Sequence, residues 1–184
     1  MDISGKILEL DTYNYNDYKL WEGDWELING HPQAMSPSPK YEHQKFSQKF
    51  SRAAGNVLIS CNESCHCELL YELDWLINDD TVIRPDCMIV CGKIKNDYLT
   101  FPPNLILEIS SPSTRMKDRN TKYNLYEMCG VKYYIIADPE KKSVEVFELV
   151  DDKYKNTLTT TFILTPQCSI ELDVFTLYKA HFFN

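Results

Sequence analysis

The sequence has few glycines, no long hydrophobic run and no excess of positive charge. Its 184 residues include 6 Gly and 9 Pro, and no biased tract or internal repeat is present, which excludes a collagen-like fibre, a disordered chain and a repeat array. The longest apolar runs, such as residues 131–137, are far shorter than the ~20 residues that a membrane helix needs. No basic-then-apolar signal pattern is found at the start, so we expect a cytoplasmic protein that does not bind membranes.

The net charge is negative. Nineteen Lys and Arg against 27 Asp and Glu give a formal charge of −8, which opposes non-specific binding to a polyanion. With 43% hydrophobic residues, a chain of this length can bury roughly 70% of its unfolded surface in one domain. We expect a single domain over residues 1–184, with residues 1–24 as a peripheral N-terminal segment.

Seven cysteines are present, an odd number that favours free thiols in a reducing compartment. Cys61, Cys65, His66 and Cys67 fall close together, and zinc prefers such ligands. Structural zinc sites usually combine two separated ligand pairs, however, and the sequence shows no second cluster. In an extended stretch Cys65 and Cys67 share one face and His66 takes the other. We therefore expect no zinc here, and unpaired thiols at Cys65 and Cys67.

The first part of the chain predicts a hairpin followed by a helix. Residues 25–35 form two short strands joined by a turn at Asn29-Gly30. A helix over about 39–55 follows, with Ser38 as its N-cap and apolar residues at every fourth position, Phe46, Phe50 and Ala54. His43 lies on this apolar face, where a core-edge histidine bonded to a backbone carbonyl is favoured over a catalytic one.

The middle of the chain predicts strands over 68–77 and 81–91, and then a buried strand at 105–109. A helix over 118–129 leads to a second buried strand at 131–137. Strand, helix and strand in ~35 residues form a right-handed crossover, so these two strands should be parallel.

The end of the chain predicts an edge-type strand at 143–150, one or two strands after residue 154 and a short helix around 174–179. The fold class is therefore α/β or α+β, with a mixed central sheet flanked by helices.

One lysine falls on the apolar side of the helix over 118–129. At 100° per residue, Asp118, Lys122, Leu125 and Cys129 share an arc of roughly 60°. Lys122 then faces the sheet, where an unpaired ammonium is costly. It either has an anionic partner or extends to the rim of the helix.

Two carboxylates lie in predicted strands that precede this helix. Glu108 is flanked by Leu107 and Ile109, and Asp86 follows Pro85, which marks a strand edge or bulge. Such acids can hold a hard divalent ion such as Mg²⁺ and position a water molecule, with a lysine to stabilise charge on a phosphate. From the residues alone, a structural cluster of ion pairs is an equal alternative.

Several motifs occur in a characteristic order. Pro85-Asp86 is followed by the segments at 105–114 and 133–139, with Glu26-Leu27-Ile28-Asn29-Gly30 before them. Over about residues 20–178 the sequence resembles the Uma-two family, a family of predicted restriction endonucleases of the PD-(D/E)XK superfamily. The resemblance implies a restriction-endonuclease-like core and phosphodiester hydrolysis that depends on Mg²⁺ or Mn²⁺.

The resemblance also implies roles for individual residues. Asp86 matches the aspartate of the PD motif and Glu108 the second acid, so these two bind the metal and the carbonyl of Ile109 completes its shell. Ser110 stands where the simple motif has lysine, and Lys122 fits the catalytic lysine in its migrated position on the following helix. Glu26 resembles an auxiliary catalytic acid, with an ordinary carboxylate at a strand end as the alternative.

The expected function is a divalent-metal-dependent endonuclease with weak, metal-dependent binding to nucleic acid. A basic segment after Glu108 supports this partner, with Arg115, Lys117, Arg119 and Lys122 close together. Ser110 and the acidic charge favour the alternative, a nuclease-fold binding or regulatory protein without strong catalysis. A hydrolase of small phosphorylated metabolites is a third reading, and a homodimer is among the oligomeric states left open.

Overall fold

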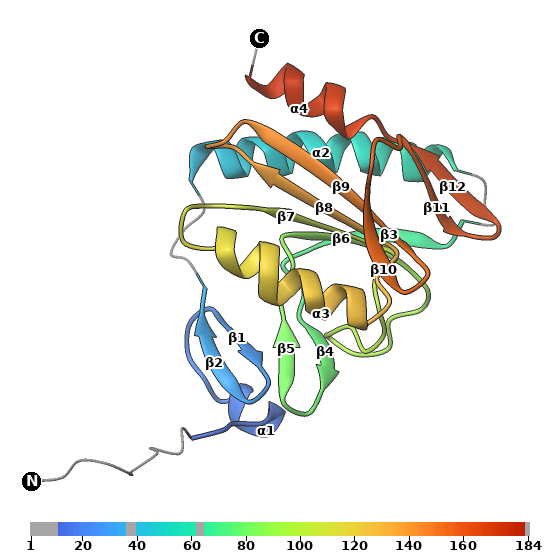
Figure 1. Cartoon of the computed structure of the whole chain (residues 1–184). Helices are drawn as coiled ribbons and strands as arrows, with labels where there is room; N and C mark the ends of the chain where they lie inside the picture. The colour runs from blue at the N-terminus through green and yellow to red at the C-terminus, as the bar shows by residue number, and fades with distance from the viewer. Residues whose placement is uncertain (1–10, 36–39, 62–64, 183–184) are drawn as a thin grey trace, which may run out of the picture.

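The computed structural model describes residues 11–35, 40–61 and 65–182. Its centre is a six-stranded sheet in the order β10-β9-β8-β7-β6-β3 (Figure 1). β7 and β8 are parallel, and the other neighbouring strands of this sheet are antiparallel. The bounds are β3 (Cys67–Tyr71), β6 (Cys87–Cys91), β7 (Leu105–Ile109), β8 (Tyr133–Asp138), β9 (Ser143–Val150) and β10 (Lys153–Thr157). The prediction of a mixed central sheet with a parallel crossover pair is confirmed.

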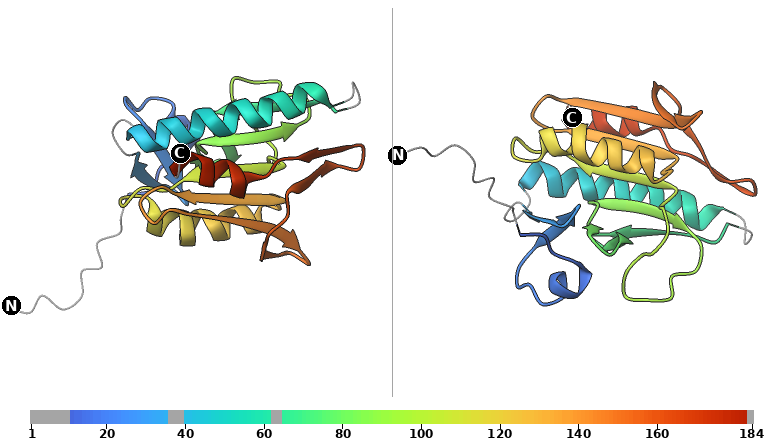
Figure 2. Two further views of the ribbon diagram at one scale, coloured as in Figure 1. Left: turned by 90° about the horizontal axis from the view of Figure 1, so that it is seen from above. Right: turned by 60° about the horizontal axis from the view of Figure 1, so that its bottom comes forward.

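Helices cover both faces of this sheet (Figures 1 and 2). α2 (Tyr41–Ser60) and α4 (Val174–Phe182) pack on one face, and α3 (Tyr123–Met128) packs on the other. Because side chains alternate along a strand, Leu105 and Leu107 of β7 join the core below α2, whereas Ile106 joins the core below α3. Glu108 follows the same alternation as Ile106 and points toward α3.

A smaller sheet, in the order β2-β1-β5-β4, lies beside the central one. Its strands are β1 (Trp25–Ile28), β2 (His31–Ala34), β4 (Trp75–Asn78) and β5 (Thr81–Ile83), next to the short helix α1 (Tyr15–Tyr18). The β1–β2 turn is the predicted one: Asn29 and Gly30 have φ of 50° and 76°, as a tight hairpin turn requires. β11 (Thr161–Thr165) and β12 (Cys168–Glu171) form a separate hairpin.

Several predicted boundaries are wrong. The single strands expected at 68–77 and 81–91 are each broken in two, because the chain leaves the central sheet after β3 and returns to it only at β6. The strand at 143–150 is not an edge, since β10 pairs with it. The long helix continues to Ser60 rather than residue 55. Its expected N-cap, Ser38, lies outside the described residues.

The prediction of unpaired thiols at Cys65 and Cys67 is also wrong. The structure joins Cys65 to Cys168 and Cys67 to Cys91 as disulfide pairs. Cys168 lies 103 residues after Cys65 in the sequence, and local strand alternation could not show that β12 brings it alongside. Separately, none of the described helices is long and apolar enough to cross a membrane.

Candidate active site

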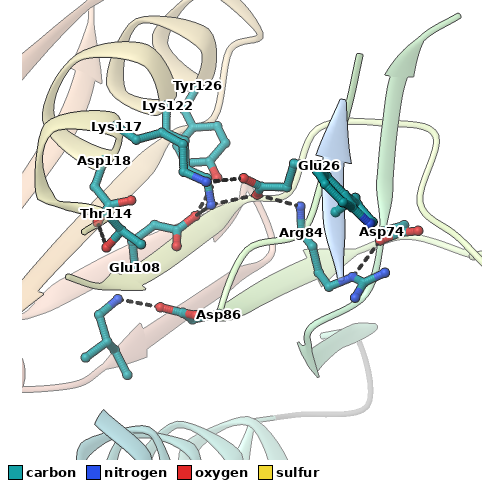
Figure 3. Close-up of polar contacts among 12 residues, drawn as sticks. Glu26, Asp74, Arg84, Asp86, Glu108, Thr114, Lys117, Asp118, Lys122 and Tyr126 are labelled. Atoms are coloured by element: carbon teal, nitrogen blue, oxygen red, sulfur yellow. Dashed lines mark hydrogen bonds and ion pairs between the residues drawn. The ribbon is translucent and has the colours of Figure 1, made fainter. Parts of the chain in front are cut away.

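A cleft of about 640 Å³ opens between the start of α2, the end of β7 and the segment before α3. The four residues predicted to be catalytic, Glu26, Asp86, Glu108 and Lys122, all line it, and Ile109 does too. Figure 3 shows their side chains converging from different strands and from the helix. The tertiary fold therefore brings the whole predicted set together, although their roles in catalysis remain predictions.

Lys122 is the centre of this group. Its Nζ lies 2.8 Å from Oε1 of Glu108 and 2.8 Å from Oε1 of Glu26, and its side chain is 4% exposed. Burial by itself lowers the pKa of Lys122, but the surrounding carboxylates, Glu108 and Glu26 above all, raise that pKa well above its usual value. The predicted contact between Lys122 and Glu108 is confirmed, and the surrounding acids favour the charged form of this buried lysine.

The helix that carries Lys122 is not regular. Residues Lys117–Lys122 form a π-helical segment that continues into α3, whereas the sequence predicts an α-helix over 118–129. Asp118 and Lys122 are the buried residues of this segment. Short π-helical segments are rare and occur frequently at functional sites, and this one presents an acid and a lysine together to the end of β7.

Glu108 is nearly buried and accepts two hydrogen bonds on one oxygen. Nζ of Lys122 lies 2.8 Å and the hydroxyl of Tyr126 lies 2.6 Å from Oε1. Burial, together with the nearby charge of Asp86, raises the pKa of Glu108 to about 8, even though Lys122 acts in the opposite direction. Both donors lie at Oε1, so Oε2 is the oxygen of Glu108 that faces away from Lys122 and Tyr126.

Asp86 is held in place from two sides. Its Oδ2 accepts a hydrogen bond from the backbone N–H of Ile109 at 2.6 Å and lies 3.1 Å from Nε2 of His43. That N–H is available because the β6–β7 ladder ends at the pair Cys87–Leu107. Burial lowers the pKa of His43, but Asp86 outweighs this effect and raises it. His43 therefore bonds a carboxylate at the site, and not the backbone carbonyl favoured from the sequence.

The donor set fits a hard divalent ion. Within the described part of the chain, the hydrogen bonds and ion pairs of Asp86 and Glu108 each fall on one oxygen, which leaves Oδ1 of Asp86 and Oε2 of Glu108 for another ligand. In Figure 3 this second oxygen of Glu108 points away from the lysines, on the side of Asp86. Mg²⁺ and Mn²⁺ prefer carboxylate and carbonyl oxygens, so Asp86, Glu108 and the carbonyl of Ile109 suit either ion.

Glu26 connects the small sheet to the cleft. It is fully buried on β1, its Oε2 accepts a bond from Lys117 at 2.6 Å, and its Oε1 accepts the backbone N–H of Arg84 at 3.1 Å as well as Lys122. Burial raises the pKa of this carboxyl, but Lys122 and Lys117 outweigh it and lower the pKa to about 2. Glu26 is therefore ionised throughout the physiological range and compensates the charge of Lys122.

Asp118 is a site residue that sequence analysis did not identify as functional. Its Oδ2 accepts hydrogen bonds from the hydroxyls of Ser110 at 2.7 Å and Thr114 at 2.9 Å. Burial raises its pKa. The sequence did contain a signal for this role, because Asp118 lies on the same helical arc as Lys122. Ser110, which replaces the lysine of the simple motif, thus holds Asp118 at the cleft.

The predicted basic segment is not a free cationic surface. Arg115 pairs with Asp138 and Glu140, and Arg119 pairs with Glu145. Lys117 and Lys122 pair with acids of the cleft. The prediction that these four cations offer a basic binding surface is wrong, because a helical segment packed on an acidic sheet end finds acids that are distant in sequence.

The pKa of Glu108 predicts a pH dependence of stability. A carboxyl whose pKa is raised from 4.5 to about 8 by folding stabilises the folded state fully below pH 4.5, and this contribution disappears as the pH rises through about 8. In a metal-chelating buffer, we expect the melting temperature to fall between pH 6 and 9. Glu108→Gln, which cannot ionise, should show a smaller fall over this range. An equal fall in both proteins would contradict the assignment.

Comparison with known proteins places this arrangement in a family. The Uma2 family model, described as "Putative restriction endonuclease", matches residues 15–175. The chain belongs to the Uma2 family. The matched range includes Glu26, Asp86, Glu108 and Lys122, the catalytic residues predicted from the sequence.

Solved structures agree with the Uma2 assignment at the level of the fold. A crystal structure described as a putative nuclease belonging to DUF820, from Anabaena variabilis, superimposes with a TM-score of 0.70 at 16% identity, covering 90% of this chain and 96% of that one. The DrdV–DNA complex matches with a TM-score of 0.34 at 12% identity, over 76% of this chain and 13% of that chain, which is too distant to support an argument. No curated protein matches the sequence.

Proposed function

We propose that this chain is a divalent-metal-dependent endonuclease that hydrolyses phosphodiester bonds of nucleic acid. The observation that carries the proposal is the set of two carboxylates, each with one oxygen left for a ligand, beside a buried lysine in an open cleft. The Uma2 family description supports the reaction class. Mg²⁺ or Mn²⁺ is the proposed cofactor, and when bound it stabilises negative charge on a phosphate.

The side chains of the cleft have separable tasks in this proposal. Lys122 supplies a fixed positive charge where negative charge develops on the phosphate, and Glu26 keeps that ammonium in position. The Ile109 N–H and His43 orient Asp86. Tyr126 orients Glu108 through its 2.6 Å hydrogen bond. Each of these side chains is held by a hydrogen bond or an ion pair, which preorganises the site.

The raised pKa of Glu108 makes the proposed cofactor binding depend on pH. A cation bound to this carboxylate competes with a proton, so the affinity for Mg²⁺ should rise between pH 6 and 8 and level off above about pH 8. Calorimetric titrations in two buffers of different ionisation enthalpy measure both the affinity and the proton released. An affinity that is constant over this range would contradict the proposed role of Glu108.

A direct assay tests the proposed reaction. Supercoiled plasmid, single-stranded DNA and RNA are each incubated with the chain and Mg²⁺, Mn²⁺ or a chelator. We expect slow cleavage with either metal and little sequence preference, because a −8 protein whose basic segment is paired has weak affinity for a polyanion. Raising the salt concentration should weaken the binding to nucleic acid and slow the cleavage further.

The second candidate is a nuclease-fold binding or regulatory protein without catalysis. It is favoured by the pairing of Lys122 with two acids and by the neutralised cations around it. If the parent chain is inert toward all three substrates with both metals, while calorimetry shows no Mg²⁺ or Mn²⁺ binding, this second candidate replaces the first.

A further inference from the structure

A group of reactive side chains lies far from the cleft, at the C-terminal end of α2. Five cysteines from separate parts of the chain gather there, Cys61, Cys65, Cys67, Cys91 and Cys168. Figure 1 shows the end of α2 beside the β11–β12 hairpin, and both pack against the same core as β3. At 1.5 Å per residue along α2, this cluster is roughly 27 Å from His43, so it is independent of the proposed active site.

The spacing of the sulfur atoms suits a single metal ion. The sulfurs of Cys61, Cys65 and Cys168 all lie within 4.8 Å of one another, and the sulfur of Cys67 lies 3.7 Å from that of Cys168. In a tetrahedral zinc site with Zn–S bonds of ~2.3 Å, neighbouring sulfurs are ~3.8 Å apart. Once the disulfides are reduced, the thiolates of Cys61, Cys65 and Cys168 are therefore within reach of one ion. Cys67, whose sulfur contacts that of Cys168 but is not within 4.8 Å of all three, has to turn toward the other two to complete the set.

Two disulfides do not account for the whole cluster. They use four of the sulfurs and leave Cys61 against both Cys65 and Cys168. The pairs are not separate cross-links either, because Cys67 of one pair contacts Cys168 of the other. A metal ion bound in the reduced chain uses the sulfur of Cys61 that the disulfides leave over, and Cys91 then remains as a free thiol.

The chain also supplies the ligand spacing that the sequence alone did not reveal. Cys61 and Cys65 are separated by three residues, within the usual interval for one pair of zinc ligands. Cys67 and Cys168 form the second pair, because β12 packs beside α2 and β3. Cys168 is 3% exposed, whereas Cys61 and Cys65 are half-buried, so an ion has a path into the site.

We propose that the reduced chain binds one Zn²⁺ through the thiolates of Cys61, Cys65, Cys67 and Cys168. Each thiol releases its proton on binding, so the ion replaces four protons and no electron is transferred. The ion joins the end of α2 to β3 and to the β11–β12 hairpin. This reverses the expectation from the sequence that the cysteine cluster holds no zinc.

Zinc content and thiol counts test the site in the full-length chain. After preparation with Zn²⁺ and a phosphine reductant, we expect about one zinc per chain, with a tenfold or greater loss in Cys61→Ser and Cys168→Ser. Cys129→Ser is the matched control, because Cys129 is a free cysteine at the C-cap of α3, outside the cluster, and this variant should retain zinc. Circular dichroism checks that each variant is folded.

Thiol titration of the parent chain, prepared without reductant and then unfolded in chelator, separates the alternatives. The zinc form should show all seven thiols, whereas two disulfides leave three, since seven minus four is three. Three thiols without zinc would overturn the proposal in favour of disulfides. Seven thiols without zinc, even after addition of equimolar Zn²⁺, would overturn it as well.

Cobalt substitution distinguishes this site from the carboxylate site. Co²⁺ in a tetrahedral thiolate site has characteristic absorption bands that oxygen ligands do not produce. We expect these bands in the parent chain and in Asp86→Ala, and their loss in Cys168→Ser. If the bands disappear in Asp86→Ala and persist in Cys168→Ser, the thiolate assignment is wrong, whatever the outcome of the nuclease assays.

Discussion

Asp86→Asn should abolish metal-dependent cleavage. The substitution keeps the size of the side chain and can keep a contact with the N–H of Ile109, but it removes the charge that a hard cation requires. We expect the cleavage rate with Mg²⁺ or Mn²⁺ to fall by at least about 10³-fold, to the level seen in chelator. The measurement is the initial rate on the best substrate of the plasmid, single-stranded DNA and RNA assays.

Asp152→Asn is the control for this loss. Asp152 lies in the exposed turn between β9 and β10 with a φ of 59°, a conformation that asparagine tolerates. It removes the same charge from the chain and should leave the rate unchanged. If the two variants cleave equally well, the assignment of Asp86 as a metal ligand fails. Equal cleavage by the two variants would also arise if a contaminating nuclease did the cutting. The assay is therefore repeated with Glu108→Ala, because a contaminant would cleave at the same rate in that preparation too.

Lys122→Met should destabilise the protein more than any other single loss of charge at the site. It leaves the ionised carboxylate of Glu26, at 0% exposure, with Lys117 as its remaining ammonium partner, and it removes the ammonium that favours the ionised form of the buried Glu108 carboxyl. Leaving a buried charge without its partner costs about 3 to 5 kcal/mol of unfolding free energy, which urea denaturation measures. Metal-dependent cleavage should also fall strongly, since removing one electrostatic contributor to a transition state costs on the order of 3 to 4 kcal/mol.

A matched control and a rescue separate these two effects of Lys122. Lys155→Met breaks the exposed pair with Asp151 and should change stability by less than about 1 kcal/mol. Adding Glu26→Gln and Glu108→Gln to Lys122→Met removes the unpaired charges, so most of the lost stability should return while cleavage stays absent. If Lys122→Met is as stable as the parent chain, the buried ion-pair cluster is not present in solution.

The sequence by itself determined the parts of this protein that depend on local pattern. The Asn29-Gly30 turn, the apolar spacing of α2 and the strand–helix–strand unit around Glu108 all follow from short-range periodicity and turn chemistry. The helical wheel placed Lys122 toward the sheet, and a buried strand with one carboxylate indicated its partner. Local sequence pattern was sufficient to predict these features, because each of them depends on residues that are a few helical turns or one strand apart in the sequence.

Tertiary structure decided which distant groups meet. The contact of His43 with Asp86, the double pairing of Glu26 and the neutralisation of Arg115 and Arg119 join residues 23 to 96 positions apart, and no local period encodes such pairs. The cysteine cluster is the clearest example, because Cys168 reaches Cys65 only through the packing of β12 beside α2. Strand order and register are set by burial over the whole chain, so these sites appear only once the sheet is assembled.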